Sequence, residues 1–150
     1  MTLSAKKGET VSVGIEGTRV KKSDFTVDGK GSMDMTVKTG TFQKNTVTGG
    51  KKADSLSFGN QVTVKGSEMD LGKGNDTVTF GAETKFKGKT TLDLGTKGKD
   101  VVEFKTEPTS GKIVIDNFDK RDELIIGGET FTKEDLEDAK FSNIKINFAD

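Results

Sequence analysis

The 150-residue chain contains no cysteine, histidine, tryptophan or tyrosine. Without cysteine it can form no disulfide framework, and without histidine it lacks the commonest general base and the commonest transition-metal ligand. These absences argue against an enzyme. Arginine occurs only as Arg19 and Arg121, and 24 basic residues balance 24 acidic ones, so the composition offers no positive excess for nucleic acid or an anionic membrane.

Long apolar runs are also missing. No segment approaches the ~20 apolar residues of a membrane helix, and residues 1–8 lack the apolar core of a signal peptide. We therefore expect no membrane insertion and no N-terminal export signal. Apolar residues make up 30% of the chain, which fits either disorder or a thin, repeated core. The strict patterning of these residues favours the thin core.

A short acidic loop recurs along the middle of the chain. It occupies residues 69–76, 92–100 and 115–122, and a weaker copy occupies residues 47–54. The first aspartates of the three clear copies are 23 residues apart, at positions 70, 93 and 116. A fixed period in the twenties predicts one structural unit per repeat, with each unit stacked on its neighbours.

The segments between the loops alternate apolar and polar residues with period two, which predicts β-strands. Apolar residues recur at fixed offsets from the loops and are expected to form inward-facing columns: Phe58, Phe80, Phe104 and Ile126; Val47, Met69, Leu92 and Ile115; and Leu56, Val78, Val102 and Leu124. The predicted fold is an all-β, parallel β-solenoid (β-roll-like) with ~22-residue turns, flattened, with two strands in each turn. An antiparallel sandwich would explain the alternation but not the fixed period.

The chain is expected to form a single domain, residues 1–150, with three parts. Residues 1–42 contain strands without a clear repeat and are expected to be an N-terminal attachment segment. Residues 43–122 carry the solenoid repeats. Residues 123–150 are expected to be a C-terminal cap: a hairpin around Gly127 and Gly128, a short helix over 132–140 with Thr132 as its N-cap, and a last strand over 143–148.

The loops resemble the RTX nonapeptide, Gly-Gly-x-Gly-x-Asp-x-apolar-x. Residues 71–79 match its second and third glycines, its aspartate and its apolar position, and residues 49–57 match both leading glycines, the aspartate and the apolar position. The resemblance implies a β-roll whose paired loops bind Ca²⁺ through backbone carbonyls and carboxylates. The implied ligands are Asp54, Asp76 and Asp100, with Asp70 and Asp93 next.

This sequence departs from the RTX pattern in two ways. Only one loop recurs per 22–24 residues, and every loop carries lysine or arginine. A column of stacked aspartates requires neutralisation, which Ca²⁺ or a parallel basic column can provide. The alternative to a calcium site is therefore an exposed aspartate–lysine ladder, each pair contributing roughly 0–1 kcal/mol.

Two other functions use residue patterns that this sequence contains in part. Threonine and serine pairs at 46/48, 55/57 and 77/79 suggest a flat hydroxyl array of the kind that binds ice, but the pattern fails at 101–103. Paired carboxylates are also used by carbohydrate-active enzymes. Here, however, the acids lie in one lysine-rich repeat, without the tyrosine or tryptophan that usually lines a sugar cleft.

The sequence thus favours a non-catalytic structural protein. We expect a homo-oligomeric β-solenoid building block, displayed on the surface of a virion (a capsid decoration, knob or fibre) or on an extracellular cell-surface appendage. Its expected partner is itself or a structural protein of the particle that it decorates, with no nucleic acid. The alternative is a calcium-binding, RTX-type secreted adhesion or binding module.

Overall fold

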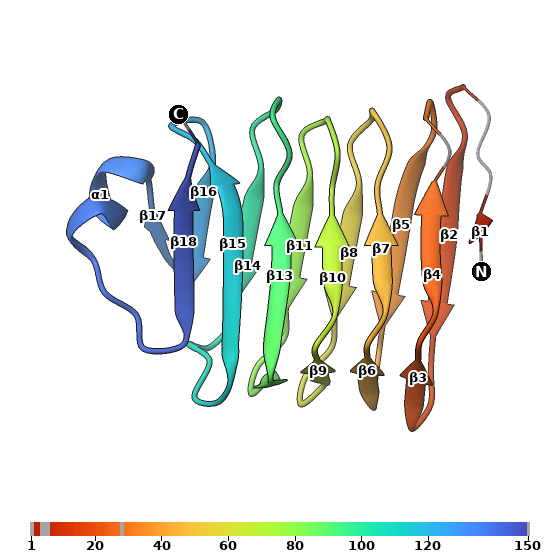
Figure 1. Ribbon diagram of the computed structural model, residues 1–150, viewed down its shortest axis with the longest axis horizontal. Coiled ribbons are helices and arrows are strands. Elements are labelled where there is room, and N and C mark those ends of the chain that lie inside the picture. Colours follow the sequence, from red (N-terminus) through yellow and green to blue (C-terminus); the bar gives the residue numbers. More distant parts are fainter. Residues whose placement is uncertain (1, 4–6, 28, 150) are drawn as a thin grey trace.

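The computed structural model describes residues 2–3, 7–27 and 29–149 of the chain. They form an all-β, parallel β-solenoid of about five turns of ~22 residues each, with one short helix near the C-terminus (Figure 1). The predicted fold class is therefore confirmed. The turns stack along one axis, and the N-terminus and C-terminus lie toward opposite ends of the stack.

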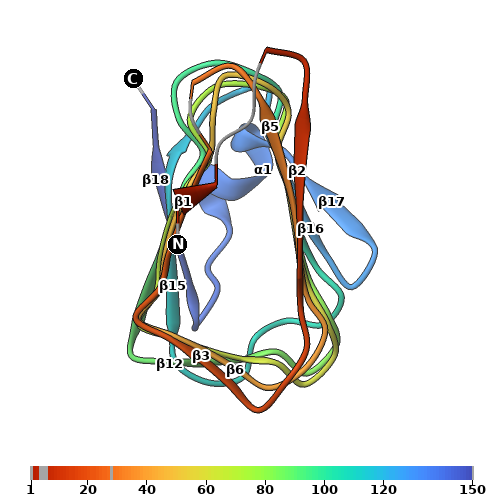
Figure 2. The ribbon, with the colours of Figure 1, turned by 90° about the vertical axis from the view of Figure 1, so that its right-hand side faces the viewer.

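Three parallel-stranded sheets run along the solenoid, and two of them face each other across the interior (Figure 2). Sheet A contains β1 (Thr2–Leu3), β4 (Asp24–Val27), β7 (Thr46–Thr48), β10 (Glu68–Asp70), β13 (Lys89–Asp93), β15 (Lys112–Phe118) and β18 (Ile144–Phe148). Sheet B contains β2 (Thr10–Ile15), β5 (Ser32–Val37), β8 (Ser55–Phe58), β11 (Thr77–Phe80), β14 (Val101–Phe104), β16 (Glu123–Ile126) and the antiparallel β17 (Glu129–Phe131). Sheet C contains β3 (Arg19–Lys21), β6 (Thr41–Gln43), β9 (Thr63–Lys65) and β12 (Lys85–Lys87).

The predicted apolar columns are confirmed by the strand register. Phe58 pairs with Phe80, and Phe80 pairs with Phe104, in adjacent strands of sheet B. Their rings stack with centroids 5.1 Å and 4.9 Å apart. Val47, Met69, Leu92 and Ile115 stack in the same way in sheet A. All of these side chains are buried, so each turn contributes equivalent residues to one continuous core.

The expected turn with two strands is wrong in one respect, because a short third strand crosses between the two long sheets. Each strand of sheet C has three residues with one inward apolar side chain: Val20, Phe42, Val64 or Phe86. A single apolar residue between polar neighbours is too short a pattern to distinguish a strand from a loop. Because of this third strand, the cross-section of the solenoid is three-sided (Figure 2), whereas the predicted coil was flattened.

The solenoid also begins earlier than residue 43. Strand β2 pairs in parallel with β5, β3 pairs with β6, and β4 pairs with β7. Residues 1–42, which the sequence predicts to be an attachment segment without a clear repeat, therefore supply strands to all three sheets. Whether this end attaches the protein to a partner stays a prediction.

The C-terminal residues leave the repeat as expected. Strands β16 and β17 form an antiparallel hairpin, and α1 (Lys133–Asp138) follows it. The carboxylate of Asp135 accepts hydrogen bonds from the main-chain N–H and the hydroxyl of Thr132, both at 2.8 Å, which fixes the start of the helix. Strand β18 then adds to sheet A beside β15. No helix in the described part of the chain is long and apolar enough to span a membrane.

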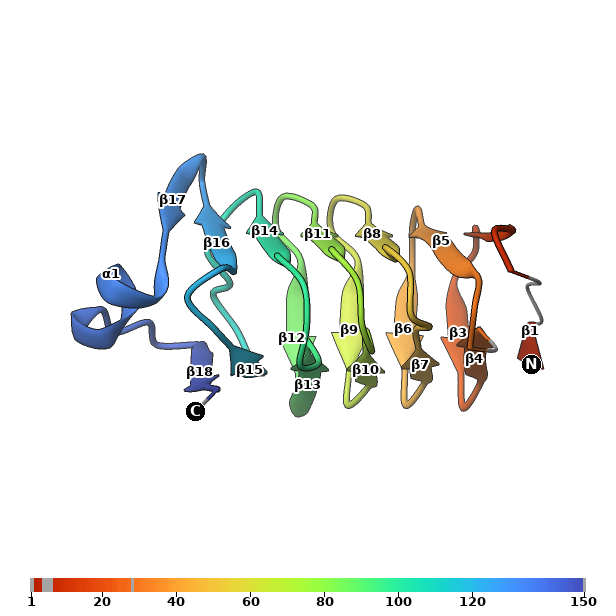
Figure 3. The ribbon, with the colours of Figure 1, turned by 90° about the horizontal axis from the view of Figure 1, so that it is seen from above.

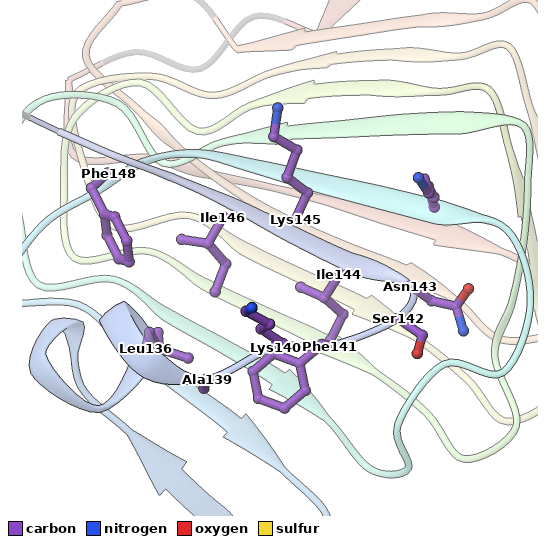
Figure 4. Close-up of a pocket in the computed structure, with 11 residues that line it drawn as sticks. Leu136, Ala139, Lys140, Phe141, Ser142, Asn143, Ile144, Lys145, Ile146 and Phe148 are labelled. Atoms are coloured by element: carbon purple, nitrogen blue, oxygen red, sulfur yellow. The ribbon is translucent and has the colours of Figure 1, made fainter.

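A cavity of about 380 Å³ lies where this cap meets the solenoid (Figure 4). Its apolar lining includes Leu136 of α1, Phe141 of the following loop, and Ile144 and Ile146 of β18. Leu136 and Ile144 are themselves buried against the core. The cavity is therefore a gap in the packing of the cap, which covers the apolar interior at this end.

Candidate functional site: the loop edge of the solenoid

The repeated acidic loops join sheet A to sheet B and stack along the upper edge in Figure 1. Glycine makes this close stacking possible. At Gly95, where φ is +80°, a Cβ atom would lie 1.8 Å from the carbonyl oxygen of Gly72 in the loop below. At Gly98, where φ is +138°, a Cβ atom would lie 1.5 Å from the carbonyl oxygen of Gly74. The glycines of the RTX-like motif are thus explained by backbone packing alone.

The aspartate that closes each loop points into the protein. Asp54, Asp76, Asp100 and Asp122 are each at most 3% exposed, and they form a column that we call the buried aspartate column. In each case Oδ1 accepts a hydrogen bond from a main-chain N–H of the preceding turn. The donors are Met33 N at 2.6 Å, Asp54 N at 2.7 Å, Asp76 N at 2.8 Å and Asp100 N at 2.9 Å. The column therefore ties each turn to the next.

The second carboxylate oxygens of this column have different surroundings. Asp54 Oδ2 accepts from Gly50 N at 2.9 Å, and Asp122 Oδ2 accepts from Asp119 N at 2.7 Å. Asp76 Oδ2 is buried without a hydrogen-bond partner among the described residues. An ionised carboxylate in that position is costly, because no donor group of these residues compensates the lost hydration.

Burial consequently raises the pKa of every member of the column. Desolvation is the main cause, and it raises the pKa of Asp76 and of Asp100 to about 7, against the opposing effect of their main-chain hydrogen bonds. Neighbouring carboxylates add to the increase at both residues. The pKa values of Asp54 and Asp122 are also raised, again mainly by desolvation. The column therefore holds protons in a pH range where surface carboxylates are ionised.

The other two candidate ligands, Asp70 and Asp93, lie in a separate column on the outer face of sheet A. Asp70 pairs in register with Asp93, and Asp93 pairs with Asp116. Asp70 Oδ1 accepts from Gly72 N at 2.9 Å, and Asp93 Oδ1 accepts from Gly95 N at 2.8 Å. These are local turns in which the side chain bonds to the main chain two residues later. The aspartates of this outer column therefore stabilise the main-chain turn at the start of these loops.

The five aspartates implied by the RTX resemblance are therefore divided between an inner and an outer column. Within the described ranges, no group of three or more acidic side chains gathers closely enough to hold a metal ion. Ca²⁺ takes six to eight oxygen ligands, so a calcium site at this edge would need main-chain carbonyl oxygens for most of them. Calcium binding stays a prediction from the resemblance.

The alternative aspartate–lysine ladder is wrong for the inner column. Main-chain amides bind its carboxylates, and none of the ion pairs among the described residues joins Asp54, Asp76 or Asp100 to a lysine. An aspartate–lysine ladder requires exposed carboxylates, which are usual for aspartate but are not found in this column. One signal could have revealed the burial, since the neighbour of Asp54 in the preceding turn is the apolar Met33.

The serine and threonine pairs also do not form one hydroxyl array. Thr46 and Thr48 lie on sheet A, whereas the pairs at 55/57 and 77/79 lie on sheet B. The array suggested by the sequence is therefore divided between two faces.

The N-terminal end is a second candidate site, because the core is incompletely covered there. Val11, Val13 and Ile15 of β2 are only partly buried, and so is Val20 of β3. Their register partners one turn later are Met33, Met35, Val37 and Phe42, and each is at most 1% exposed. Among the described residues, strand β2 is the last strand of sheet B and has a neighbouring strand on one side only. This end therefore presents apolar side chains together with an unpaired strand edge.

No family model matches the chain, and no curated protein or solved structure is significantly similar to it.

Proposed function

We propose that this protein is a non-catalytic structural subunit, a rigid β-solenoid displayed on the surface of a virion or of a cell-surface appendage and assembled through its N-terminal end. The observation that carries the proposal is the difference between the two ends. The C-terminal end is covered by a hairpin, a helix and packed aromatic rings, including Phe131 against Phe141 at 5.6 Å. The N-terminal end leaves the side chains of β2 and β3 partly exposed.

An exposed strand edge above an apolar interior favours pairing with another strand. Because the cap covers the interior at the C-terminal end, the open end of one copy meets the open end of a second copy. That contact is isologous and closes as a two-fold dimer. The two β2 strands then run antiparallel across the dyad.

The residues of β2 select the register of this pairing. If Val13 lies opposite Val13 of the second copy, then Val11 lies opposite Ile15, and all three inward apolar residues are covered. Moving the register by one pair in one direction places Ile15 opposite Glu9, which buries an acidic side chain against an apolar one. Moving it in the other direction places Val11 opposite Gly17, which has no side chain to cover it. The first register is therefore the one we expect.

The absence of cysteine from the chain allows a direct test. Val13→Cys places a thiol at the dyad, where directly opposite Cβ atoms are about 4.5–5.5 Å apart, close to disulfide geometry. We expect a disulfide-linked dimer on mild oxidation. The matched control is Thr36→Cys, on the outer face of the next strand, which should stay unlinked. Equal cross-linking of both variants, or of neither, would overturn the proposal.

The second candidate is a calcium-dependent secreted module of RTX type. It is favoured by Asp76 Oδ2, a buried acceptor without a donor among the described residues. It requires the fold to depend on calcium, because such modules bind the ion as they fold. Thermal melting followed by circular dichroism, in excess Ca²⁺ and in excess EGTA, separates the two. The structural proposal expects the same melting temperature in both, whereas the calcium proposal expects the β signal to disappear in EGTA.

A further inference from the structure

The net charge of zero conceals an uneven distribution over the faces of the solenoid. Sheet C forms the narrow edge opposite the acidic loops, and its strands lie side by side in Figure 3. Its strands present eight outward residues in two columns: Arg19, Thr41, Thr63 and Lys85; and Lys21, Gln43, Lys65 and Lys87. Five of these eight are basic and none is acidic.

Two of the four turns that follow the strands of sheet C add to this charge. Lys22 and Lys44 occupy the first two of these turns with φ of +53° and +51°, and both are exposed. We call the resulting surface the basic stripe, and its members are Arg19, Lys21, Lys22, Lys44, Lys65, Lys85 and Lys87. All seven are exposed, and none of them takes part in an ion pair with another described residue.

The stripe is straight, because it follows the stacking axis. Strands in register lie about 4.8 Å apart, so the four strands of sheet C span about 14 Å between the first and the last. Like charges at this spacing repel one another unless an anion lies among them. A linear polymer with repeated negative charge matches this geometry better than a single small anion does.

The side chains of the basic stripe indicate which class of anionic polymer fits it best. None of its outward residues is aromatic, so it offers no surface on which nucleic-acid bases could stack. Arg19 is its one arginine, whereas phosphate recognition favours the arginine fork. It presents no outward apolar residue that could anchor in a lipid interface. Instead, Thr41, Thr63 and Gln43 stand among the cations and provide donors and acceptors for hydroxyl groups.

We infer that the basic stripe of sheet C is a binding site for a linear acidic polysaccharide carrying carboxylate or sulfate groups. The lysines bind the repeated charges, and the threonine and glutamine side chains between them bind sugar hydroxyls. The stripe lies along the body of the solenoid, so this inference does not depend on how the N-terminal end is used.

Binding of the full chain to two probes, polygalacturonate and dextran sulfate, tests the inference at low ionic strength. Binding to polygalacturonate alone assigns the site to carboxylates, binding to dextran sulfate alone assigns it to sulfates, and neutral dextran should not bind. The triple variant Lys21→Gln, Lys65→Gln, Lys87→Gln removes three charge contacts and should weaken binding about tenfold. It should also reduce the dependence of binding on salt.

The opposite edge of the solenoid supplies a matched control. Lys51, Lys73 and Lys97 are equally exposed and follow the same stacking axis, and Lys73 pairs with Lys97 across adjacent loops. Changing these three to glutamine alters the net charge by the same amount and should leave binding within about twofold. Equal loss in both triple variants, or no binding of either probe by the unmodified chain, would overturn the inference. Tighter binding of a single-stranded oligonucleotide or of anionic phospholipid vesicles would overturn it as well.

Discussion

The buried aspartate column makes the stability of this protein depend on pH in an unusual direction. In the folded protein Asp76 keeps its proton up to about pH 7, whereas in the unfolded chain it loses the proton near its ordinary pKa of 3.8. Between these values the folded state binds more protons than the unfolded state. The free energy of unfolding therefore falls as pH rises, and the stabilisation is fully present only below the unfolded pKa.

The size of the effect follows from the same two values. Because Asp76 is already half ionised at its folded pKa of about 7, the loss of stability from about pH 5 to about pH 7 is about 2 kcal/mol for one such group. Asp100 acts in the same direction, although the two titrate together, so their contributions do not simply add. For a chain of this length, about 2 kcal/mol corresponds to a fall in melting temperature of roughly 4–8 °C.

Asp76→Asn isolates this contribution. Asparagine keeps an oxygen that can accept from Asp54 N and removes the charge, so the variant should be more stable than the parent at about pH 8, by about 2 kcal/mol. At about pH 5 the free energies of unfolding of the parent and of Asp76→Asn should be similar. Asp70→Asn, on the exposed outer column, is the control and should keep the pH profile of the parent.

Far-UV circular dichroism is the appropriate probe for the melts, since the chain has no tryptophan or tyrosine for fluorescence. A parent protein whose stability is constant or rises from about pH 5 to about pH 8 would refute the reasoning. An Asp76→Asn variant that melts below the parent at about pH 8 would refute it too.

Three further outcomes are expected. Gly98→Ala should cost about 2–3 kcal/mol of stability, because the added Cβ meets the carbonyl oxygen of Gly74, whereas Gly88→Ala, with open space around it, should cost about 1 kcal/mol. Urea denaturation measures both free energies of unfolding. If Gly98→Ala and Gly88→Ala lose equal stability, this explanation of the loop glycines is wrong. Phe80→Ala removes a fully buried ring stacked on both sides and should cost about 4 kcal/mol by the same measurement. A loss below about 1 kcal/mol would mean that the aromatic column is not tightly packed.

The fold could be predicted from the sequence because each turn of a solenoid repeats the packing of the turn before it. The 23-residue interval between Asp70 and Asp93 is the length of one turn, and these two residues pair in register. The same repeat that places the acidic loops one turn apart also places Phe58, Phe80 and Phe104 in register in adjacent strands. The hairpin at Gly127 was predictable because its turn chemistry is local.

The first two strands of sheet C, β3 and β6, and the buried aspartates were less accessible to sequence reasoning. A strand such as β6 has one apolar residue, Phe42, between two polar ones, and its strand conformation comes from the neighbouring turns. The burial of Asp76 likewise depends on a donor 22 residues away, at Asp54 N, which no local pattern reveals. The basic stripe follows from sheet C and was hidden for the same reason, since a balanced composition says nothing about which face carries each charge.

The most direct test of the structural proposal is the molar mass of the unmodified chain, measured by sedimentation equilibrium in EGTA from low micromolar to millimolar concentration. A 16.1 kDa chain that pairs through its N-terminal end should approach twice that mass as its concentration rises. It should do so without calcium and without forming larger species. A constant mass of one chain over the whole range would contradict the account.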